Sequence, residues 1–179
     1  MMEYKSQLMD SAQFFRTMAR LTHEIIEKNH GVDNLCLLGI KRRGVPLAKM
    51  LAENIRRFEN VDVPVGYIDI AQFRDDLAET APPSAAADCM IPCRLDETTV
   101  ILVDDVIHTG RTVRAAIEAI FRQGRPRAIQ LAVLIDRGHR ELPLRPDFVG
   151  KNIPTAKAEI VSVKVDEIDG ETSVGLYSL

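Results

Sequence analysis

The stretch VILVDDVIHTGRTV, residues 100–113, joins an apolar run to two adjacent aspartates and then to a loop with two threonines and a glycine. The apolar run predicts a buried strand over 99–103, and a helix is predicted from about 111 to 123. Neighbouring carboxylates repel each other, so a cationic or hydroxyl-bearing group should lie against them. A glycine-containing loop before a helix can hold a phosphate with its backbone N–H groups. This junction therefore predicts a site for a phosphorylated sugar together with a metal ion.

The rest of the chain repeats the alternation of apolar strands and amphipathic helices. Further strands are predicted at 35–40, 63–71, 128–136 and 159–165, and further helices at 11–29 and from 45 to about 58. Either Asp10 or Ser11 can cap the first helix. Continuous apolar strands separated by helices are typical of a parallel sheet covered on both faces. We therefore predict one α/β domain over residues 1–179, with a central parallel sheet flanked by helices.

Three groups of polar residues directly follow predicted strands. They are residues 39–43, the pair Asp104 and Asp105, and residues 136–140. Ligands of open parallel sheets bind at the carboxyl ends of the strands. We therefore expect the three groups to converge on one edge of the sheet.

Composition narrows the class of protein. The chain has 179 residues, a net charge of −3 and short apolar runs, and its start lacks a secretory hydrophobic region, which together predict a cytoplasmic protein without a membrane partner. Its three cysteines do not suggest a disulfide framework, and no second Cys or His pair near Cys89 and Cys93 would complete a zinc site. The acidic balance excludes a generally basic nucleic-acid-binding surface but permits a local basic patch.

The motif VILVDDVIHTGRTV resembles the phosphoribosyl diphosphate (PRPP) signature of type I phosphoribosyltransferases. The stretches LLGIKRRGVPLAKMLAENI, GYIDIAQFRDDL and IQLAVLIDRGHRELPLRPDFVGKNIPT resemble bifunctional pyrimidine-operon attenuators that are also uracil phosphoribosyltransferases. The resemblance implies the type I phosphoribosyltransferase fold, with a flexible flap at about 72–98. It also implies a small hood formed by about 137–179 with part of the N-terminus.

The same resemblance implies two activities. The family converts uracil and PRPP to UMP and diphosphate with Mg²⁺ as cofactor. Its members also bind the leader mRNA of pyrimidine genes when UMP is present, which attenuates transcription. A homo-oligomer, dimeric or higher, is expected from the family, since symmetric assemblies are common.

The resemblance assigns the ligand site residue by residue. The PRPP and UMP site would comprise Lys41, Arg42, Arg43, Val103, Asp104, Asp105, Val106, Ile107, His108, Thr109, Gly110, Arg111 and Thr112. Asp104 and Asp105 would be catalytic, bind the ribose hydroxyls and hold the metal mainly through water or PRPP, with Asp166 as a further metal candidate. The loop Lys41–Arg43 would bind the leaving diphosphate, where electrostatic stabilisation acts on developing charge. Arg74, on the flap, would be a catalytic residue that neutralises the diphosphate.

Base recognition is expected from four residues: Ile107, Arg137, Ile160 and Val161. Ile107 would offer an apolar face to the uracil ring, and main-chain groups of the late strand would read the base. His108 has two interpretations. A neutral imidazole could act as a base near its own pKa, or it could pack and form hydrogen bonds within the phosphate loop.

The RNA-binding candidates are basic residues: Arg16, Arg20, His23, Arg140, Arg145 and Lys151. Arg16, Arg20 and His23 share a helix face by their spacing, although a solvated face would explain the two arginines equally well. Two other functions stay open at this point. One is a salvage phosphoribosyltransferase for another nucleobase without RNA binding, and the other is a regulator that uses the PRPP site only to sense a nucleotide.

Overall fold

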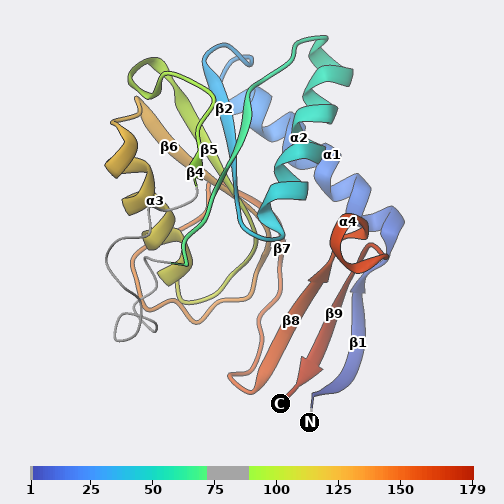
Figure 1. Ribbon diagram of the computed structural model, residues 1–179. Coiled ribbons are helices and arrows are strands. Elements are labelled where there is room, and N and C mark those ends of the chain that lie inside the picture. The colour runs from blue at the N-terminus through green and yellow to red at the C-terminus, as the bar shows by residue number, and fades with distance from the viewer. Residues whose placement is uncertain (1, 72–88) are drawn as a thin grey trace.

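The structure is a computed structural model that describes residues 2–71 and 89–179, and it contains two sheets of different topology (Figure 1). The larger sheet has six strands in the order β4-β3-β2-β5-β6-β7, and the smaller has three in the order β1-β9-β8. Arg74 and most of the predicted flap lie outside the described residues. No described helix combines the length and the apolar character that crossing a membrane requires.

The six-stranded sheet is parallel except at one edge. Its strands are β2 (Leu35–Ile40), β3 (Val65–Ile68), β4 (Cys89–Met90), β5 (Thr99–Ile107), β6 (Ala128–Asp136) and β7 (Phe148–Asn152). Only β4 runs antiparallel to its neighbour, β3. The α/β prediction with a central parallel sheet is confirmed. Some details differ from the prediction. The strand predicted at 63–71 is shorter, and residues 89–98 of the predicted flap contain β4 and a 3₁₀ turn (Leu95–Glu97).

Helices cover both faces of this sheet. They are α1 (Ser11–Lys28), α2 (Gly44–Glu59) and α3 (Arg111–Gln123). A fourth, short helix, α4 (Asp166–Asp169), lies near the C-terminal end of the chain. Figure 1 shows α1 and α2 on one side of the sheet and α3 on the other. Two buried apolar clusters correspond to these two sides. Asp10 caps α1, since its side chain accepts the Gln13 N–H at 2.8 Å and the Gln13 side chain accepts the Asp10 N–H.

The smaller sheet joins the two ends of the chain. Its strands are β1 (Glu3–Met9), β8 (Glu159–Lys164) and β9 (Ser173–Ser178), all antiparallel. Both termini lie at this sheet in Figure 1. The range 137–179 expected for the hood also includes β7, which instead pairs with β6 in the larger sheet.

Strand β5 continues through the acidic pair. Its pairing with β6 runs on from Asp104 to Ile107, so the prediction that the strand ends at residue 103 was wrong. The ladder continues because its hydrogen bonds come from main-chain groups, which do not require apolar side chains. Successive side chains of a strand point to opposite faces. Asp104 is accordingly buried and Asp105 half-buried.

Candidate functional site

A cavity of about 490 Å³ lies at the carboxyl ends of β2, β3 and β5. Its lining residues are Lys41, Arg42, Arg43, Asp69, Ile70, Ala71, Asp104, Asp105, Val106 and Thr112. The structure therefore brings together the predicted cationic loop and the acidic pair. The third predicted group, residues 136–140, does not line this cavity, so only two of the three groups converge there. Its His139 and Arg140 line a separate cavity together with His108 and Thr109.

The basic loop, Lys41–Arg43, is held in place by two glycines that flank it. A Cβ atom on Gly44 would lie 2.4 Å from the carbonyl oxygen of Val103, and one on Gly39 would lie 2.5 Å from the carbonyl oxygen of Gly44. Only glycine permits this close backbone approach. The peptide bond between Lys41 and Arg42 is cis.

The cations of the basic loop face carboxylates from other elements. The Nζ of Lys41 lies 3.8 Å from Asp69 Oδ2 and 4.2 Å from the centre of the Tyr67 ring. Arg43 forms an ion pair with Asp169 of α4, with 2.7 Å between Nη2 and Oδ1. The hydrogen bonds that Arg43 donates to Asp169 raise the pKa of its guanidinium, so this cation is fully charged.

The acidic pair is arranged around main-chain donors. Asp104 Oδ1 accepts the Asp105 N–H at 2.9 Å, and Asp105 Oδ1 accepts the Val106 N–H at 2.8 Å. Burial, and then the neighbouring Asp105 charge, raise the pKa of Asp104 well above its ordinary value. Such a carboxyl favours any ligand that brings a cation or hydroxyl donors beside it.

The loop 108–110 leads into the N-terminus of α3. Gly110 is the N-cap residue and has φ = 95°, a conformation that favours glycine. The carbonyl of Thr109 accepts the N–H groups of Glu141 and Leu142 at 2.9 and 3.1 Å. The exposed Arg111 pairs with Glu141 at 2.6 Å. These contacts fix the loop, and the helix start presents N–H groups suited to an anion.

Arg140 supports the same loop from inside the protein. Its Nη1 donates to the His108 carbonyl at 2.9 Å, its Nε donates to the Leu144 carbonyl, and its Nη2 lies 2.6 Å from Asp136 Oδ2. A guanidinium with three internal acceptors holds the loop in place, which is a different role from the RNA contact expected of it. No local pattern in the sequence signals this role, because the acceptors include a carbonyl 32 residues away.

His108 stands beside a second histidine. Its ring centre lies 5.9 Å from that of His139 in an edge-on arrangement. Burial, followed by the charges of Arg137 and His139, lowers the pKa of His108 below its usual value. The imidazole is therefore neutral at pH 7, and both of its predicted roles stay available.

The base-recognition candidates differ in their surroundings. Arg137 is only 7% exposed, and its Nε donates to Thr155 Oγ1 at 3.1 Å. Ile107 is 2% exposed within the apolar core on the α3 side, so its side chain does not offer a free face to a ring. Val106 lines the cavity in its place. Val161 also belongs to the core, whereas the half-buried Ile160 lies on β8, an edge strand whose main chain pairs on one side with β9.

A magnesium ion fits this site in one particular way. Among residues 2–71 and 89–179, no group of three or more His, Cys, Asp or Glu side chains could by itself hold a metal ion. Mg²⁺ commonly binds one or two carboxylates and completes its shell with water and substrate phosphates. Asp104 and Asp105 suit that mode. Asp166 is exposed at the first position of α4.

Three of the six RNA candidates lie around one cavity of about 310 Å³ between α1 and β7. Its lining residues are Met9, Gln13, Arg16, Thr17, Arg20 and Lys151. His23 lies apart from this cavity and stacks on Phe58 of α2, with ring centres 4.2 Å apart. Arg145 lines a further cavity of about 880 Å³ with Arg140.

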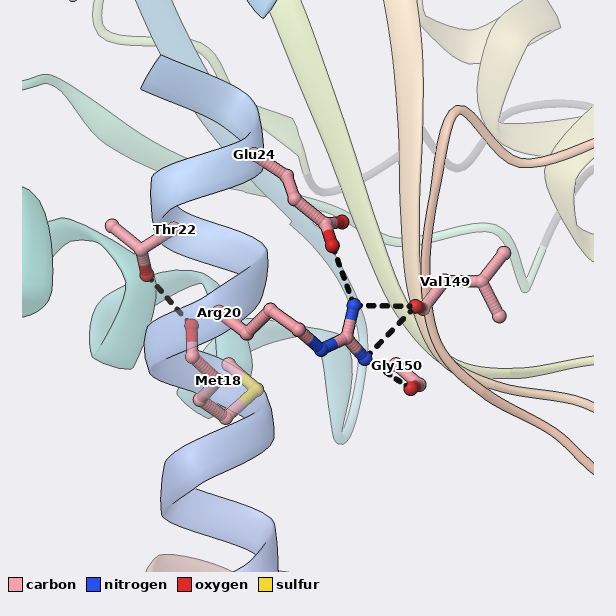
Figure 2. A network of polar contacts seen from close by, with 6 residues as sticks. All are labelled: Met18, Arg20, Thr22, Glu24, Val149 and Gly150. Atoms are coloured by element: carbon pink, nitrogen blue, oxygen red, sulfur yellow. Dashed lines mark hydrogen bonds and ion pairs between the residues drawn. The ribbon is translucent and has the colours of Figure 1, made fainter. Parts of the chain in front are cut away.

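Figure 2 shows that Arg20 already has internal partners. Its Nη1 lies 2.6 Å from Glu24 Oε1, and its Nη2 donates to the carbonyls of Val149, at 3.3 Å, and Gly150. Arg20 therefore has structural contacts, although its side chain is still 47% exposed, as a solvated helix face would require. Its contacts tie α1 to β7.

A family model and the sequences of known proteins both match nearly the whole chain. The phosphoribosyl transferase domain model matches residues 5–168. A bifunctional protein PyrR of Acetivibrio thermocellus is 55% identical over 175 residues, covering 98% of this chain and 95% of that protein. The bifunctional protein PyrR of Brevibacillus brevis is 56% identical over 175 residues, covering 98% of each.

Solved structures are similar at the level of fold. The hypoxanthine phosphoribosyltransferase of Trypanosoma cruzi matches with a TM-score of 0.73 and 18% identity, covering 98% of this chain and 97% of that one. A hypoxanthine-guanine phosphoribosyltransferase of Bacillus anthracis matches with a TM-score of 0.69 and 19% identity, covering 97% and 98%. At such low identity the likeness concerns the fold alone.

Proposed function

The chain belongs to the phosphoribosyl transferase domain family and, within it, to the bifunctional PyrR proteins, and from this premise we propose that it has two activities. The first is uracil phosphoribosyl transfer, in which uracil and PRPP give UMP and diphosphate. The second is UMP-dependent binding to the leader mRNA of pyrimidine genes, which attenuates their transcription. Both PRPP and messenger RNA are cytoplasmic molecules, so the proposed activities belong in the cytoplasm.

One observation carries the enzymatic proposal: the acidic pair and the basic loop line the same cavity. Asp104 and Asp105 accept hydrogen bonds from the ribose hydroxyls, and N–H groups at the start of α3 bind the 5′-phosphate. The basic loop binds the diphosphate and stabilises the charge that develops on it as the bond to the ribose breaks. A regulator that only sensed UMP would have no diphosphate for this loop to bind.

Magnesium is part of the proposal. Bound beside Asp104 and Asp105, largely through water and PRPP, Mg²⁺ would neutralise charge on the phosphates. The protein contributes the fixed carboxylates and the cationic loop that orient PRPP.

Uracil is proposed to bind near Arg137 and the main chain of β8. Arg137 is held by Thr155 and the Ala156 carbonyl, so its guanidinium meets the base with little loss of conformational freedom. Ile160 and Val161 contribute through main-chain groups, since Val161 is buried in the core. His108 packs against the base site without serving as an essential base.

For RNA binding we propose the cavity between α1 and β7, with Arg16 and Lys151 contacting phosphates. The protein acts as a homo-oligomer, which would repeat this surface by symmetry. Few aromatic side chains are present, so phosphate contacts and base-edge hydrogen bonds provide most of the binding.

The first experiment supplies uracil, hypoxanthine and guanine separately to the full chain with PRPP and Mg²⁺ and follows nucleotide formation. UMP formation from uracil alone is expected. Turnover of a purine without turnover of uracil would establish the salvage alternative instead.

The second experiment measures binding of a labelled pyrimidine-leader RNA hairpin with and without UMP at fixed salt. Binding should strengthen with UMP and weaken by roughly tenfold when Arg16 and Lys151 are replaced by alanine. Arg125→Ala, an exposed arginine that lines a different cavity, is the matched control and should bind like the wild type. Unchanged binding in the double variant, or equal loss in the control, would refute the assigned surface.

A further inference from the structure

The ion pair between Arg43 and Asp169 connects two regions that are 126 residues apart. Arg43 belongs to the basic loop and lines the cavity, whereas Asp169 is the last residue of α4, between β8 and β9 of the smaller sheet. The pair is bidentate, with Nη2 donating to Oδ1 at 2.7 Å and Nε donating to Oδ2 at 3.3 Å. Bidentate arginine–carboxylate pairs fix orientation as well as adding energy.

The Asp169 carboxylate is anchored independently of Arg43. Its Oδ2 accepts the Val165 N–H at 2.8 Å, while its own N–H donates to the Val165 carbonyl at 2.7 Å. Its side chain is 18% exposed, and Val165 is fully buried. The main chain thus holds the carboxylate in place, and the carboxylate in turn orients the longer side chain of Arg43.

The charges around Arg43 favour a defined orientation. The hydrogen bond from Arg43 is the main cause that lowers the pKa of Asp169, so both partners stay charged at neutral pH. The Asp105 carboxylate in the cavity also acts on Arg43. Since the pair with Asp169 uses Nε and Nη2, both N–H groups of Nη1 lie outside it and remain for a ligand.

We propose that Asp169 is a positioning residue for PRPP: it holds the Arg43 guanidinium at the cavity in the orientation that receives the diphosphate. This inference rests on the proposed transferase function and assigns a role to a residue outside the cavity lining. Without Asp169, Arg43 would have to be ordered when the diphosphate binds, which weakens binding. The binding of uracil and of the ribose hydroxyls does not involve this ion pair and is not affected.

The test replaces Asp169 by asparagine, which keeps an oxygen for the Val165 N–H but removes the charge. The matched control is Glu167→Gln on the same helix, whose exposed carboxylate pairs with Lys49 at 2.9 Å. Asp169→Asn should raise the KM for PRPP and the dissociation constant of diphosphate with Mg²⁺ by about tenfold each, leaving kcat within about threefold and the KM for uracil unchanged. The control should match the wild type in all four quantities.

Calorimetric titration of diphosphate, below the unfolding temperature of each variant, separates the inference from the proposed reaction. A wild type that makes no UMP would contradict the proposed reaction, while the diphosphate titrations of wild type and Asp169→Asn would still decide the role of Asp169. Asp169→Glu restores the charge and should recover part of the affinity. Unchanged or tighter diphosphate binding in Asp169→Asn, or equal impairment of both Asp169 variants, would overturn the proposal.

Discussion

Replacing Asp104 by asparagine should stabilise the fold at neutral pH while stopping catalysis. The amide keeps the oxygen that accepts the Asp105 N–H, removes the charge and replaces the second carboxyl oxygen by an NH₂ group of similar size. Burial and Asp105 raise the pKa of Asp104 in the folded protein, whereas the unfolded carboxyl titrates near 3.9. Between these two pKa values the folded state binds more protons, so the wild-type free energy of unfolding falls as pH rises above about 4.

The size of the effect follows from the burial of the carboxyl. A buried polar group without full compensation costs about 1–3 kcal/mol, and Asp104 is 7% exposed. In a chain of this length each kcal/mol shifts the unfolding temperature by roughly 2–4 °C. The unfolding temperature of Asp104→Asn should therefore exceed that of wild type only slightly at pH 4, and by roughly 2–12 °C at pH 8.

Thermal unfolding from pH 4 to pH 8, with UMP synthesis measured on the same samples, checks this prediction. The exposed Asp33→Asn makes the same chemical change at the surface and should stay within about 0.5 kcal/mol of wild type. The double change Asp104→Asn with Asp105→Asn should abolish UMP synthesis without unfolding the chain. A lower stability of Asp104→Asn than of wild type at pH 8, or turnover like that of wild type, would refute this prediction.

Three further predictions concern the loops of the site. Arg140→Ala removes the partner of Asp136 and a donor to the His108 carbonyl, so it should lower the free energy of unfolding by about 2 kcal/mol in urea titrations and raise the KM for PRPP. Gly44→Ala places a Cβ 2.4 Å from the Val103 carbonyl and should cost about 1–3 kcal/mol by the same assay, with weaker diphosphate binding. His108→Gln should keep kcat within about threefold between pH 7 and 8.5, because the glutamine amide is uncharged like the neutral imidazole and can still form hydrogen bonds in the loop; a loss of a hundredfold or more would identify a general base.

The parts of the fold that could be predicted are those coded by local apolar patterns. The run LCLLGI became a fully buried strand, and the helix predicted from about 111 to 123 was found at Arg111–Gln123. Strands β1 and β9 were not predicted. They pair with each other across the whole length of the chain, and most of β1 is exposed, so it lacks a buried alternation. Pairing at that distance depends on the tertiary structure, not on a local pattern.

The sequence motifs of the candidate site were predicted, but the contacts between residues far apart in the sequence were not. Adjacent aspartates and a cationic loop are visible as motifs, and the structure brings them to one cavity. The extension of β5 through Asp104 and Asp105 depends on the length of its neighbour β6, which a single segment does not reveal. The contacts of Arg140 and of Asp169 with distant partners likewise follow only from the folded chain.

The contacts of Arg20 have a consequence for the solubility of the protein. Strand β7 is the edge of the six-stranded sheet, and an open edge invites another chain to add a strand. Arg20 donates hydrogen bonds to the carbonyls of Val149 and Gly150 and so places a charged side chain on this edge strand, which discourages such pairing. Arg20→Ala would therefore remove a charged side chain from this edge strand, and samples of this variant should scatter light at concentrations where Arg16→Ala stays clear.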